Sequence, residues 1–158
     1  MTRLILISMA SILLFVVHAG NAQESDSAYD GQLFTGCAPL RVAVGFSMTN
    51  TDLALAEEAL SKAAESRLRA ARLFRTDSAQ FLSVDLNVVG TAFSLRIGLN
   101  SWVGDMGFGR GGTVLMWGSG ATGTHGGDPQ YILGLVSRHL DEFVLKYLRV
   151  NEEPCKPG

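Results

Sequence analysis

The chain has 158 residues, of which 47% are hydrophobic, and its 13 basic and 15 acidic side chains give a formal net charge of −2. This size fits one ordinary domain with a buried core, and a second domain is not expected. The weakly acidic balance lacks the positive surface of proteins that bind nucleic acid or anionic membranes, so neither is an expected partner.

Residues 1–22 have the pattern of a cleavable secretory signal peptide. Arg3 precedes an apolar run over residues 4–17, and residues 20–22 (Gly-Asn-Ala) form a small-x-small cleavage site. The apolar run is shorter than the roughly 20 residues that a membrane-spanning helix needs. The sequence therefore predicts a periplasmic or secreted protein with no stable membrane span after cleavage; an uncleaved N-terminal anchor is the alternative.

Two cysteines, Cys37 and Cys155, lie near the two ends of the expected mature chain. In an oxidising compartment such a pair predicts one structural disulfide that joins the ends. The alternative is two free thiols, but neither cysteine belongs to a C-x-x-C pair or has a conspicuous basic cluster beside it.

After the signal peptide, residues 23–38 read as a polar leader and residues 39–158 as a single α+β domain. Apolar and small residues alternate over residues 40–48, a period of two that indicates a strand with one buried face. Leucine and alanine then recur at spacings of three and four from Asp52 to about Leu73, which predicts a helix with Asn50 or Thr51 as its N-cap. A cluster of four arginines falls at the end of this helix, where cations complement the helix dipole: Arg67, Arg69, Arg72 and Arg75.

Residues 81–99 predict a β-hairpin whose two-residue turn is Gly90-Thr91. Glycine in the first position of such a turn favours type II′. On the other face of the hairpin Asp85 falls opposite Arg96, which predicts an exposed ion pair. On the apolar face the register pairs Val88 with Phe93, Leu86 with Leu95, Val84 with Ile97, and Leu82 with Leu99.

The last part of the chain predicts a strand from Thr113 to Trp117, extending at most to Thr122, and a mobile glycine-rich connector over residues 118–127. A closing helix follows, with Asp128 as N-cap and Pro129 in the favoured first position. The fold class is therefore α+β, a mainly antiparallel sheet with two helices packed on one face, in the order strand-helix-strand-strand-strand-helix.

Three packing patterns lie between residues 40 and 151: Leu82-x-Val84-x-Leu86, Met116-Trp117 before glycines, and Phe143-x-x-x-Tyr147-Leu148-x-x-Asn151. Together they resemble a loose group of exported bacterial proteins of unknown function. The resemblance implies a location in the bacterial envelope and a small α+β domain. It implies no activity, because these patterns concern packing.

Motifs for chemistry are weak. Residues 118–123 match G-x-G-x-x-G, but no helix begins at the last glycine and no parallel strand follows, so no nucleotide or other cofactor is expected. Two histidines remain in the mature chain: His125, expected in solvent, and His139, expected at the edge of a buried helix stripe. Neither belongs to a metal-ligand motif, and Ser119 lacks the G-x-S-x-G context of a hydrolase nucleophile.

The aromatic residues of the glycine-rich region are the remaining candidates for function. Trp102 and Phe108 are possible surface contacts, whereas Trp117 follows an apolar run and is expected in the core. We therefore expect no catalytic, cofactor or metal residues and a non-enzymatic accessory or binding module, whose partner is an envelope protein or a glycan. The alternative is a small metal-dependent or hydrolytic enzyme that uses His125, Asp128 and His139.

Overall fold

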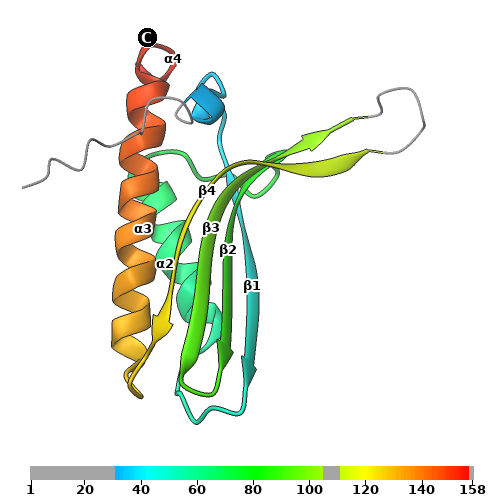
Figure 1. Ribbon diagram of the computed structural model, residues 1–158. Helices are drawn as coiled ribbons and strands as arrows, with labels where there is room; N and C mark the ends of the chain where they lie inside the picture. Colours follow the sequence, from blue (N-terminus) through cyan, green and yellow to red (C-terminus); the bar gives the residue numbers. More distant parts are fainter. Residues whose placement is uncertain (1–30, 105–110, 157–158) are drawn as a thin grey trace, which may run out of the picture.

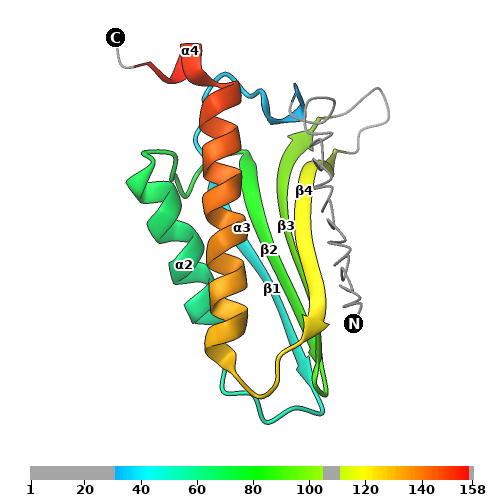
Figure 2. The ribbon, with the colours of Figure 1, turned by 60° about the vertical axis from the view of Figure 1, so that its left-hand side comes forward.

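The computed structural model describes residues 31–104 and 111–156, so the expected signal peptide lies outside the described residues. One layer is a sheet in the order β1-β2-β3-β4, and the other layer consists of α2 and α3, which lie on the same side of the sheet (Figures 1 and 2). The α+β class and the order of elements are confirmed. The elements are η1 (Gly31–Leu33), β1 (Arg41–Thr49), α2 (Glu57–Ala70), β2 (Gln80–Val89), β3 (Ala92–Val103), β4 (Gly112–Thr124), α3 (Pro129–Val150) and α4 (Glu152–Cys155).

The sheet is parallel between β1 and β2, which α2 connects, and antiparallel from β2 to β4. The predicted register of the β2–β3 hairpin is confirmed at all four apolar pairs, from Val88↔Phe93 to Leu82↔Leu99. Gly90 has a φ of 59°, and Thr91 is not among the residues with positive φ. This combination is the pattern of a type II′ turn, which requires positive φ at its first central residue only.

The core lies between the sheet and the helices. Alternate residues of β2 and β3 face a stripe of α3 that begins at Ile132 and ends at Tyr147, and all of these side chains are buried. Trp117 is only 7% exposed, as the sequence indicates. Its ring lies 5.4 Å from that of Phe143, centroid to centroid, so the middle of β4 packs against α3.

The N-terminal segment is clamped to the end of α3. The predicted disulfide is present, with Cα atoms of Cys37 and Cys155 5.2 Å apart. Asn151, fully buried, accepts hydrogen bonds from the backbone N–H groups of Thr35 and Cys37 at 2.9 and 3.2 Å and donates to Leu33 O at 2.9 Å. Leu33 is itself part of the core, so packed structure extends into the segment that reads as a polar leader.

The start of α2 differs from the prediction. The helix begins at Glu57 and not at Asp52, and its N-cap residue, Ala56, makes no side-chain hydrogen bond. The preceding segment is extended because Leu53 and Leu55, two residues apart, both bury their side chains. The leucine spacing that resembles a helical period is, at this point, a strand-like period of two.

The end of α2 has an unusual C-cap. The N–H of Leu73 donates to Leu68 O at 2.8 Å and the N–H of Arg72 to Arg69 O at 3.0 Å, the two bonds of a Schellman motif. Arg72 occupies the left-handed position of this motif with a φ of 59°, where glycine is usual.

The predicted mobile connector over residues 118–127 is largely wrong, because β4 continues to Thr124. The glycine content reflects a close approach between strands: a Cβ on Gly120 would lie 2.2 Å from Leu95 O. A backbone bond from His125 N–H to Thr91 O, 3.0 Å long, continues the attachment of this segment past the end of the strand.

Candidate functional site

The β3–β4 hairpin extends beyond the rest of the sheet. Gln80, the first residue of β2, pairs with Ser101, so the later residues of β3 have only β4 beside them among the described strands. Figure 1 shows this hairpin projecting away from the helices. We call residues 100–103 of β3 together with residues 112–115 of β4 the arm.

The arm exposes large apolar side chains on both of its faces. Trp102 is 57% exposed, Val114 49%, Leu115 48% and Val103 36%. The strand register places Trp102 and Leu115 on one face, and Val103 and Val114 on the other. None of the eight residues of the arm is charged. The arm is therefore an apolar surface exposed to solvent.

The side chains at the base of the arm are fixed by packing. Asn100 is 8% exposed and donates from Nδ2 to Ser83 Oγ at 3.1 Å and to Gly98 O at 3.0 Å. Leu115 lies over Gly98, where its Cδ1 is 2.5 Å from the place that a Cβ would occupy. These contacts hold β3 and β4 in a defined position relative to β2.

The course of the arm is also set by an irregularity in the strands. Leu99 pairs with Trp117 but Asn100 pairs with Leu115, so Met116 has no register partner. A bulge of this kind bends the strand and increases its twist.

Near the end of the arm, the indole of Trp102 lies over Gly111, with Cζ2 2.4 Å from the position of a Cβ there.

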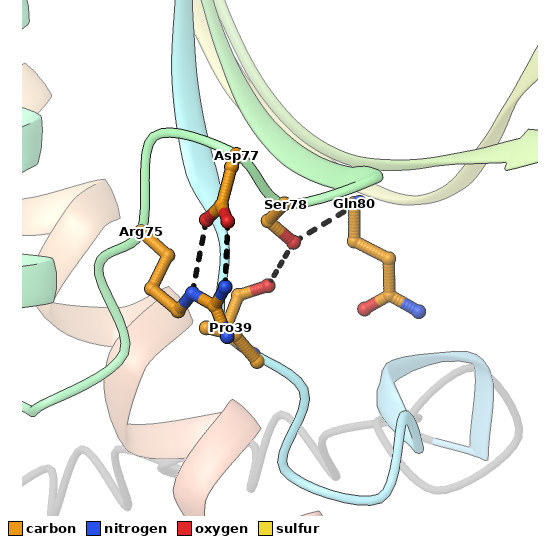
Figure 3. A network of polar contacts seen from close by, with 5 residues as sticks. All are labelled: Pro39, Arg75, Asp77, Ser78 and Gln80. Carbon is orange, nitrogen blue, oxygen red and sulfur yellow. Dashed lines mark hydrogen bonds and ion pairs between the residues drawn. The ribbon is translucent and has the colours of Figure 1, made fainter.

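A polar network fixes the start of β2, and hence the point where the arm leaves the sheet (Figure 3). The Arg75 guanidinium donates from Nε to Asp77 Oδ1 at 2.9 Å and from Nη2 to Oδ2 at 2.6 Å, and these hydrogen bonds lower the pKa of the Asp77 carboxyl. Ser78 Oγ donates to Pro39 O and accepts from the N–H of Gln80 at 3.3 Å. The contacts of Ser78 thus join Pro39, before β1, to the beginning of β2, and the Arg75–Asp77 pair lies in the loop that leads to it.

Next to the arm, the sheet face opposite the helices, here the open face, contains two adjoining hollows. The larger, of about 680 Å³, lies along β4 and is lined by residues 115–122 among others. The smaller, of about 390 Å³, lies between β1, β2 and β3. Ser94 and Arg96 line both hollows. The open face is a shallow surface of mixed polar and apolar character that continues from the arm.

The predicted ion pair on the open face is not formed. Asp85 and Arg96 are register partners, but no ion pair within 4.0 Å joins them in the described part of the chain. Asp85 turns instead toward β1, because Gly45 leaves space there: Asp85 Oδ1 lies 2.5 Å from where a Gly45 Cβ would be.

The residues of the rival metal-site hypothesis are occupied with structural roles. His125 is 6% exposed, so its expected place in solvent is wrong. Its Nδ1 accepts from Gly127 N–H at 3.0 Å and its Nε2 lies 2.9 Å from Gly90 O, which fixes the hairpin turn against the start of α3. Asp128 caps α3 by accepting from Gln130 N–H at 2.8 Å, as predicted. Among the described residues no group of three or more potential metal ligands comes together.

The sequence did not predict one contact that brings a possible nucleophile next to a possible base. Ser119 Oγ lies 3.0 Å from Nδ1 of His139, which is partly buried on α3. Glu142 Oε2 lies 3.9 Å from the same nitrogen. Because 20 residues separate the serine from the histidine, only the packing of α3 on the edge of β4 brings them together.

The other predicted sites have clear outcomes. Residues 118–123, the G-x-G-x-x-G match, lie within β4 and not at the start of a helix. Of the two aromatic contacts, Trp102 is exposed on the arm, whereas Phe108 lies outside the described residues. Within the described chain, no helix combines the length and apolar character that crossing a membrane requires.

Comparisons with protein-family models, with curated proteins and with solved structures find no match. No function can therefore be transferred from a relative, and the resemblance to exported bacterial proteins remains a prediction. The functional proposals therefore rest on the geometry of the arm, the open face and the Ser119–His139 contact.

Proposed function

We propose that this protein is a non-enzymatic binding module of the bacterial cell envelope and that the arm is its contact surface. The observation that carries this proposal is the exposure of four large apolar side chains on one short hairpin with a fixed base. A concentrated apolar surface of this kind usually marks an interaction site, and a rigid aromatic residue supplies contact area at a small entropic cost.

The remaining exposed apolar side chains differ from those of the arm. Phe34, Val89, Tyr131 and Leu145 are similarly exposed, but they are separated along the chain, and the two that share an element, Tyr131 and Leu145, lie about four helical turns apart on α3. Isolated apolar residues are normal on protein surfaces. The arm is therefore the favoured contact surface within the described chain.

Export is supported by the N-terminal sequence and by the disulfide. The Cys37–Cys155 bridge is typical of proteins that fold in an oxidising compartment. The bridge joins the N-terminal segment to α4 and includes no residue of the arm. The bridge therefore stabilises the module without taking part in the proposed contact.

The proposal is tested by photocrosslinking in cells that export the protein. A photoreactive amino acid replaces Val114 on the arm or, as a matched control, Leu145 on α3, which is more exposed at 70%. We expect defined adducts from position 114 and none from position 145. Equal adducts from both positions, or none from position 114, contradict the proposal.

The second candidate function is hydrolysis, which the Ser119–His139 contact favours. A serine nucleophile needs a base within hydrogen-bond distance, and the 3.0 Å separation meets this requirement. It ranks second because Glu142 approaches the same Nδ1 as Ser119. An orienting acid acts on the nitrogen opposite the one that serves the nucleophile.

Labelling with a fluorophosphonate probe separates the two candidates. The binding-module proposal predicts no labelling of the oxidised mature protein. Labelling that is abolished by Ser119→Ala but retained in Ser94→Ala, a control on the open face, would establish the hydrolase instead.

A further inference from the structure

We propose that the arm binds the lipid–water interface of a membrane, where its apolar side chains enter the boundary between headgroups and acyl chains. This inference rests on the proposed function, since it names the partner of the same contact surface. It requires only that the arm be free to meet a membrane surface.

The distribution of apolar side chains favours a lipid interface over a groove on a protein. Trp102 and Leu115 point to one face of the arm while Val103 and Val114 point to the other. A protein that docks on one face leaves the opposite pair in water. A fluid medium that surrounds the arm removes both pairs from water at once.

The absence of charge in the arm is consistent with this environment. A charged side chain is costly to transfer toward the hydrocarbon region, and residues 100–103 and 112–115 contain none; the two charged residues between them, Asp105 and Arg110, have opposite charges and lie outside the described residues. Trp102 adds a residue type that is enriched where headgroups meet acyl chains, because its ring is apolar and its N–H can still form a hydrogen bond.

The backbone limits how deep the arm can go. Among the described strands, the β4 edge of the arm and its β3 edge beyond Ser101 have no partner, so their N–H and C=O groups need water or headgroups for hydrogen bonding. Hydrocarbon offers no such groups. The arm therefore lies in the interfacial layer and does not span the membrane.

The overall charge predicts that binding of the arm does not need anionic lipid. The chain has a net charge of −2, so electrostatic attraction to anionic lipid does not drive the contact. Binding that depends on apolar insertion needs only zwitterionic lipid and resists screening by salt.

The two tryptophans allow a direct test. Trp117 is buried and Trp102 exposed, so Trp117→Phe leaves Trp102 as the sole indole. This variant, with its disulfide intact, is titrated with phosphatidylcholine vesicles. We expect a blue shift of the emission at low and high salt, and quenching when the acyl chains are brominated near the headgroups.

Variants establish that the arm carries the binding. Val114→Lys, in the same background, should lower the vesicle partition coefficient about tenfold or more, because it removes an apolar side chain and adds a charge. Leu145→Lys, the same change of charge on α3, should leave it unchanged. Far- and near-ultraviolet circular dichroism checks that each variant is folded.

The outcomes distinguish the two proposals. No blue shift, or a shift seen only with anionic vesicles and lost at high salt, overturns the lipid proposal. If vesicles fail while the photoreactive residue at 114 forms a protein adduct in cells, the partner is a protein and the binding-module proposal stands. If both experiments fail, neither proposal survives.

Discussion

Replacing Asn151 by alanine tests the physical account of how the N-terminal segment is held to the domain. Its side chain makes four hydrogen bonds, all to backbone groups: Oδ1 accepts from Thr35 and Cys37, and Nδ2 donates to Leu33 O and Tyr147 O. Asn151 is 0% exposed, so water does not replace these partners in the folded state.

The expected loss follows from the groups that are left without a partner. Tyr147 O still accepts the N–H of residue 151 at 3.0 Å, which leaves three orphaned groups: the N–H of Thr35, the N–H of Cys37 and the C=O of Leu33. An unpaired buried group costs about 1–3 kcal/mol, which applies in full to Leu33 O and only in part to the N–H groups of Thr35 and Cys37, which are partly buried. We expect the free energy of unfolding to fall by about 2–4 kcal/mol, a substantial part of the roughly 5–15 kcal/mol typical of a domain.

Urea unfolding with the disulfide intact measures this loss, and Asn87→Ala serves as the control because Asn87 is exposed on β2. The control should change the free energy of unfolding by less than about 0.5 kcal/mol. Amide exchange at Thr35 and Cys37 should also become faster in the Asn151 variant. A loss below about 1 kcal/mol, or one equal to that of the control, would refute the assigned role of Asn151.

Four further predictions concern stability. Arg72→Gly should raise the free energy of unfolding by about 0.5–1 kcal/mol in urea titrations, because glycine takes the left-handed position without steric cost; a decrease would contradict the C-cap described for α2. Gly120→Ala should destabilise by about 1–3 kcal/mol, since the added Cβ meets a carbonyl oxygen, and an unchanged midpoint would argue against the close approach. Reduction of the Cys37–Cys155 bridge, which closes a separation of 118 residues, should lower the melting temperature in calorimetry, with a loss of up to about 4–5 kcal/mol; an unchanged melting temperature would be inconsistent with a structural bridge. Burial raises the pKa of the Tyr147 phenol, so its contribution is complete below about pH 10 and is lost as the pH rises through the folded-state pKa; Tyr147→Phe should flatten this alkaline decline in urea unfolding, and an unaltered decline would exclude Tyr147 as its source.

The parts of the fold that sequence predicted correctly depend on local patterns. The β2–β3 hairpin combines a period of two with a glycine in a two-residue turn, and both features act on neighbouring residues. The start of α3 is equally local, since Asp128 and Pro129 form the cap themselves. The disulfide followed from the presence of two cysteines in a chain that the N-terminal sequence predicts to be exported.

The errors arise where a distant partner decides the structure. The glycines of β4 resemble a flexible connector until β3 is placed beside them. His125 looks like a solvent residue in a glycine loop, but its partner carbonyl belongs to Gly90, 35 residues earlier. Neither relation leaves a periodic signal in the sequence.

The candidate site was predicted only in part. Trp102 stood out as a large aromatic residue near glycines, but Val114 and Leu115 belong to an apolar run that also fits a buried strand. Both residues lie on β4, which is at the edge of the sheet and has only β3 beside it among the described strands. Strand order decides which strand is at the edge, and a single sequence does not specify that order.

The central claim, that the arm is a contact surface in the cell envelope, is tested most directly by its accessibility. Thr113→Cys places a thiol opposite Trp102 while it leaves every large apolar side chain of the arm in place, and Leu145→Cys is the control. The reaction of each variant with a maleimide is followed in the purified protein and in intact envelopes that contain it. We predict that position 113 reacts rapidly in the purified protein and is protected in envelopes, whereas position 145 reacts in both. Equal reactivity of position 113 in the two preparations would contradict the claim.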